Sequence, residues 1–268
     1  MITQADSGVQ DGVNRRVYHR KQIVGEYLWP ELWRTEAMAL LKYQPAFAGR
    51  DVLDLGVGAG RTSRFLAPLA RRYEGIDYSP FMVQYMREEM PQFSVRLGDM
   101  RDLSPFADGS FDFVLGANNV IAAISHDDRL RTLSEVWRVL RPGGTFMFSC
   151  HNRRYNRALG GPRLRISRNP VTLGRNVVSY VRSTINHRRV GKLRRMEPTY
   201  ALLNDYAHDY ALLHYYIDRD AQTQQLTDAG FRLLDVFNDS GAILGPHDRD
   251  DDSFFLMYVA IRDAKSVD

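Results

Sequence analysis

A run of glycines between two carboxylates has the spacing of a nucleotide-binding turn. The run Asp54-Leu55-Gly56-Val57-Gly58-Ala59-Gly60 follows a short apolar segment and precedes an amphipathic one. Glycines there let a ligand approach the backbone, and the helix that follows offers free N–H groups at its start. Asp77 lies 17 residues after Gly60. At that position a carboxylate can accept hydrogen bonds from both hydroxyls of an adenosine ribose.

Two details set this turn apart from a dinucleotide-binding turn. The pattern G-x-G-x-x-G would need glycine at position 61, where the chain has Arg61. Asp54 stands directly before the glycines, and its charge suits a cationic ligand better than a pyrophosphate. The turn therefore favours a ligand that combines an adenosine with a positive charge.

The surrounding sequence predicts the elements that would hold this turn. From residue 49 to 150, short apolar runs alternate with amphipathic stretches, a pattern typical of βαβ units on a parallel sheet. We expect helices over about 61–71, from Pro80 to Met90, and from a cap at Asp127 or Asp128 to Leu140. The expected strands cover residues 51–55, 73–77, 93–97, 111–115 and 145–149.

The last part of the chain continues this pattern. Residues 211–217 are expected to be extended, and Asp218 is expected to cap a helix that ends at Gly230. Residues 231–237 and 254–261 then form an antiparallel edge. The predicted fold is an α/β, Rossmann-like, doubly wound sheet of seven strands with an antiparallel last strand. An N-terminal helical lid and a basic helical insertion after the fifth strand complete it.

Five segments of the first half resemble the class I S-adenosylmethionine-dependent methyltransferases. They occur in the family's order and at ordinary family spacing between about residues 51 and 150. The resemblance is weaker from residue 215 to 260, and it fades in the first 40 residues and in the basic insertion. The segments are VLDLGVGAGRTS, EGIDYSPFMV, GDMRDL, FDFVLGANNVI and RVLRPGGTFMFS.

The resemblance implies S-adenosylmethionine as the cofactor and a role for each matching residue. Asp54 and the backbone of Gly56, Gly58 and Gly60 would hold the methionine portion, and Asp77 the ribose. The residues implied at the other end of the cofactor are Tyr78 and Met82 flanking the adenine, Asp99 accepting from its amino group, Met100 giving a backbone contact, and Asn118 beside the methyl group. No metal is expected, because the transfer itself does not require one.

The acceptor side has two candidate general bases. A hydroxyl acceptor profits from a base within hydrogen-bond reach. His151 follows the fifth expected strand directly, and His214 precedes the last crossover helix, so both could lie at the carboxyl ends of the strands. Tyr18, Trp29 and Trp33 belong to the segment expected to form the lid. We expect His151 first, and His214 second, to act as the base.

Residues 153–195 form an arginine-rich segment. They hold 13 of the 36 Lys and Arg of the chain and none of its 32 Asp and Glu. Twelve of the 13 are arginines, which favours bidentate contact with phosphate or carboxylate. Asn169-Pro170 predicts the start of a helix with one apolar face. We expect this segment to recognise an anionic acceptor, with Arg153, Arg154 and Arg157 as substrate-binding residues.

These features divide the chain into four parts and leave three functions open. The expected parts are a lid (1–45), a cofactor-binding core (46–151), the basic insertion as a substrate cap (152–205) and a completion of the core sheet (206–268). The favoured function is methyl transfer to a small-molecule or glycan acceptor, at a hydroxyl oxygen of an anionic substrate. The alternatives are an RNA methyltransferase that contacts phosphates through the insertion, and a non-catalytic or membrane-peripheral protein of this fold.

Composition limits where the protein works. No apolar stretch approaches the roughly 20 residues of a membrane-spanning helix. The first residues lack the apolar core of a secretory signal, so we expect a cytoplasmic protein. The single cysteine, Cys150, excludes an intrachain disulfide and is expected to be a buried strand residue. The oligomeric state does not follow from the sequence.

Overall fold

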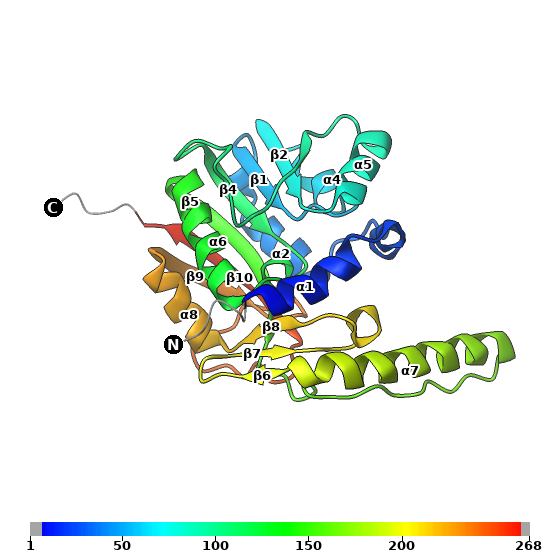
Figure 1. The fold of residues 1–268 in the computed structure, drawn as a ribbon. Helices are drawn as coiled ribbons and strands as arrows, with labels where there is room; N and C mark the ends of the chain where they lie inside the picture. The colour runs from blue at the N-terminus through cyan, green and yellow to red at the C-terminus, as the bar shows by residue number, and fades with distance from the viewer. Residues whose placement is uncertain (1–6, 264–268) are drawn as a thin grey trace.

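A mixed β-sheet with helices on both faces organises the chain in the computed structural model, which describes residues 7–263 (Figure 1). Five parallel strands lie side by side in the order β3-β2-β1-β4-β5. β10 pairs antiparallel with both β5 and β9. The strands of this core are β1 (Asp51–Leu55), β2 (Arg72–Asp77), β3 (Val95–Leu97), β4 (Phe111–Gly116), β5 (Leu140–Asn152), β9 (Phe231–Phe237) and β10 (Phe255–Arg262). The predicted doubly wound sheet with an antiparallel last strand is confirmed.

The whole sheet has ten strands, so the predicted number of seven is wrong for the sheet and right for its core. The three further strands are β6 (Arg195–Met196), β7 (Tyr200–Leu203) and β8 (His214–Ile217). They exist because β5 continues past the end of β4, and its last two residues pair with Tyr216 and Ile217 of β8. Two-residue strands such as β6 are too short to give a period-two pattern in the sequence.

Two apolar clusters cover the two faces of the sheet. Because strand side chains alternate between faces, Phe146 and Phe148 of β5 join one cluster and Met147 joins the other. The first face is covered by α6 (His126–Val139) and α8 (Arg219–Asp228). The second is covered by α2 (Arg34–Lys42), α3 (Gln44–Phe47), α4 (Ser63–Leu66) and α5 (Pro80–Glu89). Cys150 is buried in the first cluster.

Two helices differ from their predicted bounds for local reasons. The helix expected over residues 61–71 is only the single turn α4. Pro68 lies in the expected span, and its missing N–H and its ring oppose continuation. α6 is capped by Ser125, whose hydroxyl accepts from the Asp128 N–H at 3.2 Å, and not by Asp127 or Asp128. Those two carboxylates lie in the first turn, where their negative charges interact favourably with the positive end of the helix dipole.

The segments before and between the core units are mostly helical. α1 (Ser7–Tyr18) and the 3₁₀ helix η1 (Lys21–Tyr27) precede α2. α7 (Pro170–Val190) starts as predicted, since the Asn169 side chain accepts from the Val171 and Thr172 N–H groups at 3.0 and 3.1 Å. Figure 1 shows α7 extending away from the sheet. Among residues 7–263, no helix is both long and apolar enough to cross a membrane.

Candidate functional site

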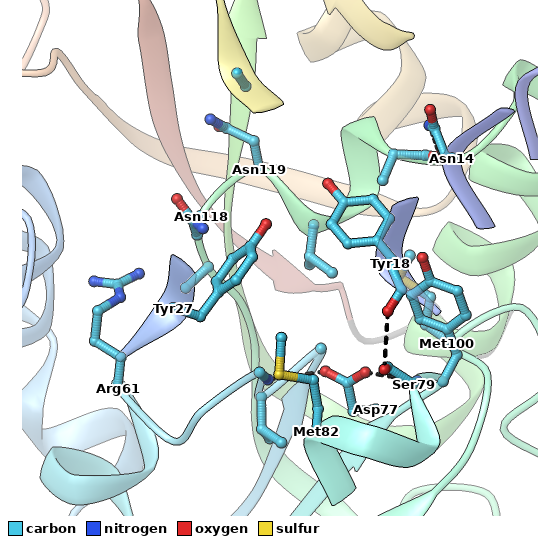
Figure 2. A pocket seen from close by; sticks show the side chains of 18 of the residues that line it. Asn14, Tyr18, Tyr27, Arg61, Asp77, Ser79, Met82, Met100, Asn118 and Asn119 are labelled. Atoms are coloured by element: carbon cyan, nitrogen blue, oxygen red, sulfur yellow. Dashed lines mark hydrogen bonds between the residues drawn. The ribbon is translucent and has the colours of Figure 1, made fainter. Parts of the chain in front are cut away.

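A cavity of about 730 Å³ opens at the carboxyl ends of the parallel strands. Residues that directly follow or end β1, β2, β3, β4 and β5 line it, together with parts of the N-terminal segment. This volume lies within the roughly 300–1,000 Å³ common for small-molecule sites. Figure 2 shows Asp77, Met82 and Asn118 around the cavity, with Tyr18 and Tyr27 across it.

The three glycines of the turn serve different purposes. All three have φ values between 54° and 79°, which side chains rarely tolerate. A Cβ on Gly56 would clash with the Val120 side chain, and one on Gly60 would lie 2.5 Å from the Met86 sulfur. Gly58 has open space apart from Tyr27. Gly56 and Gly58 line the cavity and Gly60 does not, so Gly60 permits close packing behind the turn.

Asp77 lies on the cavity wall and holds the turn in place. Its two carboxylate oxygens accept from the N–H groups of Gly58 and Ser79, each at 2.8 Å. Burial raises the pKa of Asp77 to about 6, although these two hydrogen bonds favour the ionised form. A carboxylate has about four acceptor positions, so two remain for a ligand. The predicted ribose contact fits this arrangement.

Asp54 does not line the cavity. Its Oδ2 accepts from the Thr62 hydroxyl at 2.8 Å and from the Tyr73 hydroxyl at 2.9 Å. Burial raises the pKa of Asp54 to about 6, although these two hydrogen bonds lower it. The carboxylate therefore braces the back of the glycine turn, and a direct contact with the methionine portion stays a prediction.

The residues predicted around the adenine come together on one side of the cavity. Tyr78, Met82, Asp99 and Met100 all line it. Arg101 holds both oxygens of Asp99, at 2.9 and 2.6 Å. Burial would raise the pKa of Asp99, but the hydrogen bonds and charge of Arg101 outweigh it and keep this pKa below its usual range. A ligand amino group would share Asp99 with Arg101.

Two asparagines mark the end of β4. Asn118 lines the cavity where the methyl group is predicted, and Asn119, which the sequence analysis missed, lies beside it (Figure 2). Both have a left-handed backbone, with φ values of 51° and 58°. The Asn119 N–H donates to Ser149 at 2.7 Å. Asparagine tolerates this conformation better than most residues. The Asn118-Asn119 pair in the sequence could therefore have indicated a left-handed turn after β4.

The N-terminal segment covers the cavity. Tyr18, Tyr27, Trp29 and Trp33 line it, and the role of this segment as a lid stays a prediction. Burial raises the pKa of Tyr18 and of Tyr27, so both phenols stay neutral. The Ser79 hydroxyl donates to the Tyr18 carbonyl at 3.0 Å and links this segment to the Asp77 loop (Figure 2).

Two buried amides hold α1 against the rest of the protein. Asn14 donates to the Ala123 carbonyl at 2.7 Å and exchanges two hydrogen bonds with the backbone of Leu213. Gln10 donates to the same Leu213 carbonyl at 3.0 Å. These contacts hold α1 against the residues that follow β4 and precede β8.

A buried ion pair connects the glycine turn to α2. Arg61 forms two hydrogen bonds with the Glu36 carboxylate, one of them at 2.7 Å. Glu36 also accepts from the Trp33 N–H at 2.8 Å. Because Trp33 and Arg61 both line the cavity, this pair positions one of its walls.

Breaking that pair should destabilise the fold. Glu36→Gln is expected to lower the free energy of unfolding by about 3 kcal/mol, since it leaves the buried Arg61 charge uncompensated. Urea denaturation of both proteins would measure the difference. The double variant Glu36→Leu/Arg61→Met, which removes both charges, should recover most of the loss. Equal stability of Glu36→Gln and the unmodified protein would contradict the prediction.

The two histidines predicted as general bases belong to a group of buried polar residues at the cavity. His151 and His214 both line the cavity, and their ring centroids lie 4.8 Å apart. His214 Nδ1 lies 2.7 Å from Oδ2 of Asp205, which also accepts from the Tyr216 hydroxyl at 2.8 Å. One imidazole nitrogen of His151, one of His214 and a carboxylate oxygen of Asp205 lie within 4.8 Å of one another. Asp205 was missed by the sequence analysis because no motif accompanies it.

The two histidines differ in their suitability as a base. Burial, followed by the proximity of His214, lowers the pKa of His151 to about 3, so it stays neutral and weakly basic. Burial alone would raise the pKa of Asp205, but the charge and hydrogen bond of His214 hold it well below its usual range. The ionised Asp205 fixes Nδ1 of His214 and leaves Nε2 to exchange protons. This geometry favours His214 over His151.

The three arginines predicted to bind substrate lie outside the set of residues that line this cavity. Arg153 donates to the Pro198 carbonyl at 2.9 Å, and Arg154 pairs with Asp220 at 2.7 Å. Arg154 also borders a second hollow of about 310 Å³, and Arg157 is exposed. Their role in acceptor binding stays a prediction.

Known proteins with a similar sequence include methyltransferases. Residues 52–144 match a family described as a methyltransferase domain. The chain is 40% identical over 107 residues to a probable S-adenosylmethionine-dependent methyltransferase of Mycolicibacterium smegmatis, covering 40% of each protein. It is 37% identical over 141 residues to a demethylmenaquinone methyltransferase of Beutenbergia cavernae, covering 52% of this chain and 54% of that protein. The chain therefore matches about half or less of the length of these relatives.

A solved structure extends the similarity in fold to most of the chain. It is the 1,6-didemethyltoxoflavin-N1-methyltransferase of Burkholderia thailandensis, solved with 1,6-didemethyltoxoflavin and S-adenosylhomocysteine. The TM-score is 0.59 at 16% identity, over 94% of this chain and 88% of that one. The strand order, the glycine turn and these matches lead to one conclusion. Residues 52–144 therefore carry a methyltransferase domain, and the chain is similar to S-adenosylmethionine-dependent methyltransferases in sequence over that part and in fold over most of its length.

Proposed function

We propose that this protein is an S-adenosylmethionine-dependent methyltransferase that acts on a small molecule. One observation carries the proposal: Gly58 and Asp77 line the same cavity as His214, whose Nδ1 lies 2.7 Å from Asp205 behind the cavity wall. Gly58 and Asp77 would hold a nucleoside, and His214 can take a proton from an acceptor. The relatives named for quinone and toxoflavin substrates support a small-molecule acceptor.

The residues of the site fit the cofactor. Gly58 leaves space for a ligand against the backbone, and Asp77 keeps free acceptor positions for two ribose hydroxyls. Met82 and Tyr78 offer apolar surface for a purine. When bound, S-adenosylmethionine supplies a methyl group on a cationic sulfur, which an acceptor oxygen or nitrogen can attack directly.

The Asp205–His214 pair would prepare the acceptor. Nε2 of His214 would take the proton of an acceptor O–H or N–H, and Asp205 would stabilise the resulting imidazolium. The low basicity of His151 makes it a packing partner of His214 in this scheme. The other contribution of the protein is alignment, because methyl transfer is an in-line displacement that depends on proximity.

A more specific class of acceptor, such as a glycan or an anion, would need contacts with the arginine-rich segment. A glycan or an anionic acceptor bound by Arg153, Arg154 and Arg157 draws on the composition of the arginine-rich segment alone, since these arginines do not line the cavity. We therefore define the proposed acceptor by the cavity, as a small molecule with an O–H or N–H that His214 can deprotonate.

Transfer of labelled methyl groups tests the proposal. The protein, labelled S-adenosylmethionine and an extract of the host cells would be incubated and separated into RNA, lipid, glycan and small-molecule pools. We expect label in the small-molecule pool, and none with Asp77→Ala. Label confined to RNA would contradict the proposal and favour the RNA methyltransferase alternative.

A further inference from the structure

One side of α7 contacts Asp209. Ser183 and Val190 are buried on that side. The hydroxyls of Ser179 and Ser183 donate to Asp209 Oδ1, at 2.7 and 3.2 Å, and Asn186 donates to the Asp209 carbonyl at 2.9 Å. Asp209 belongs to the short helix η4 (Ala207–Tyr210). These polar contacts fix which face of α7 points away from the protein.

The outward face of α7 is aliphatic. Spacings of three, four and seven residues place Val171, Val178, Val181 and Ile185 on one side of the helix. Their exposed fractions are 63%, 59%, 50% and 60%. The solvent side of a surface helix normally carries polar residues. An outward stripe of this kind marks a binding surface.

Arginines flank the stripe. Arg175, Arg182 and Arg189 are spaced by seven residues, so they share one edge of the helix, and all three are exposed. Arg182 has a weak contact with Asp209 at 3.4 Å. No Asp or Glu occurs anywhere in residues 153–195. The charged residues that this segment places around the aliphatic stripe are therefore all positive.

The chain before α7 widens this surface. Asn176 donates to the Arg165 carbonyl at 2.8 Å, which holds the extended residues 163–168 beside the helix. Leu164 and Ile166 of this stretch are 43% and 87% exposed. Figure 1 shows the stretch running alongside α7, away from the sheet. The two segments together expose aliphatic side chains among arginines.

We propose that α7 and residues 163–168 dock this protein on the surface of an anionic lipid bilayer. Helices with a basic polar face and an aliphatic face lie in the interface of such bilayers, where lipid phosphates and carboxylates meet the arginines and the acyl chains cover the aliphatic side chains. An RNA would satisfy the arginines and leave the valines exposed to water. A second copy packed through α7 would bring arginines against arginines, with no carboxylate of this segment between them.

Docking would take place next to the cavity wall. Asp209, which holds the inner side of α7, follows His208, which lines the cavity. His208 in turn contacts Tyr27 of the N-terminal segment at 3.1 Å and Glu26 at 2.7 Å. η4 thus lies between the docking surface and the cavity. The proposal concerns location and does not depend on the proposed acceptor.

Sedimentation with vesicles tests the proposal directly. We expect the full chain to pellet with phosphatidylcholine vesicles that contain about 30% phosphatidylserine, and to stay in solution with phosphatidylcholine alone. Added salt should release it, because the arginine contribution is electrostatic. No difference between the two vesicle types would overturn the proposal.

Variants separate the two parts of the surface. Val178→Ser/Ile185→Ser should weaken binding about tenfold, since both side chains lose acyl-chain contact. Arg175→Gln/Arg182→Gln/Arg189→Gln should weaken it about 100-fold, at roughly 1 kcal/mol per residue. The control Arg64→Gln/Arg87→Gln/Arg131→Gln removes the same charge from exposed positions outside residues 153–195 and should bind like the unmodified chain.

Folding and competing occupants are checked in the same series. The replaced side chains are exposed, so circular dichroism should show unchanged helix content. A control variant that loses as much binding as the α7 arginine variant would overturn the proposal, because net charge alone would then explain the effect. Failure to bind vesicles, combined with a dimer that Val178→Ser/Ile185→Ser dissociates in sedimentation velocity, would assign the surface to a second copy and overturn it as well.

Discussion

Asp205→Asn is expected to lower kcat for methyl transfer by about 10²–10⁴-fold. The carboxylate holds His214 Nδ1 at 2.7 Å and would stabilise the imidazolium that forms when Nε2 takes the acceptor proton. An amide in its place removes the charge and can present N–H to the ring, which favours the wrong tautomer. The rate of label incorporation into the small-molecule pool at saturating cofactor measures this effect.

Two controls separate this role from a structural one. His214→Ala should lose activity to a similar extent, and Asp205→Asn/His214→Ala should be little worse than either single variant, because the two residues act as a unit. Affinity for S-adenosylhomocysteine should not change in any of them. If His151→Gln lost as much kcat as Asp205→Asn, the assignment of His214 as the base would be wrong.

Asp77→Ala is expected to weaken binding of S-adenosylhomocysteine by about 1,000-fold, through the loss of two charge-assisted hydrogen bonds to ribose hydroxyls. The substitution also leaves the N–H groups of Gly58 and Ser79 without their acceptor. Isothermal titration calorimetry would measure the change. Thermal unfolding of the same variant shows whether the turn remains folded.

The raised pKa of Asp77 gives this binding a pH dependence of known sign. With a pKa of about 6 in the free protein, the carboxyl becomes protonated below that pH. The protonated form must give up an acceptor position, so the ligand prefers the ionised form, and affinity should fall by up to about tenfold per unit below pH 6. Above about pH 7 it should be constant. Asp77→Asn should bind weakly and without this dependence, whereas a sloping profile for that variant would contradict the assignment.

The core of the fold could be predicted because its signals are local. Strands buried on both faces are rich in apolar residues, as in β1 and β4, and the turn residues between them fix where each strand ends. The Ser79-Pro80 and Asn169-Pro170 pairs marked two helix starts correctly. Local signals failed where two of them competed. The amphipathic pattern of residues 61–71 predicts a long helix, whereas Pro68 opposes its continuation, and α4 ends at Leu66.

Residues of the cavity wall were predictable where a motif or the boundary of a predicted element indicates their position. The glycine turn, Asp77 and the residues after β3 and β4 follow strands of fixed order, so sequence position determines their place. Asp205 has no such relation. It comes within reach of His214 because β7 and β8 pair antiparallel, with Leu203 opposite His214. No periodicity in residues 195–217 encodes that pairing strongly enough to predict it.

The length of β5 constrains how this protein can be rebuilt. One part of the strand pairs with β4 in the parallel core of the sheet, and its last two residues pair with β8, the strand that begins with His214. β10 runs antiparallel to it from Thr145 to His151 and bridges both halves. Because β10 pairs with β5 across this junction, we expect the two halves to move as one body. For chimeras, the natural splice point for grafting a different acceptor module lies after Asn152, where the shared strand ends.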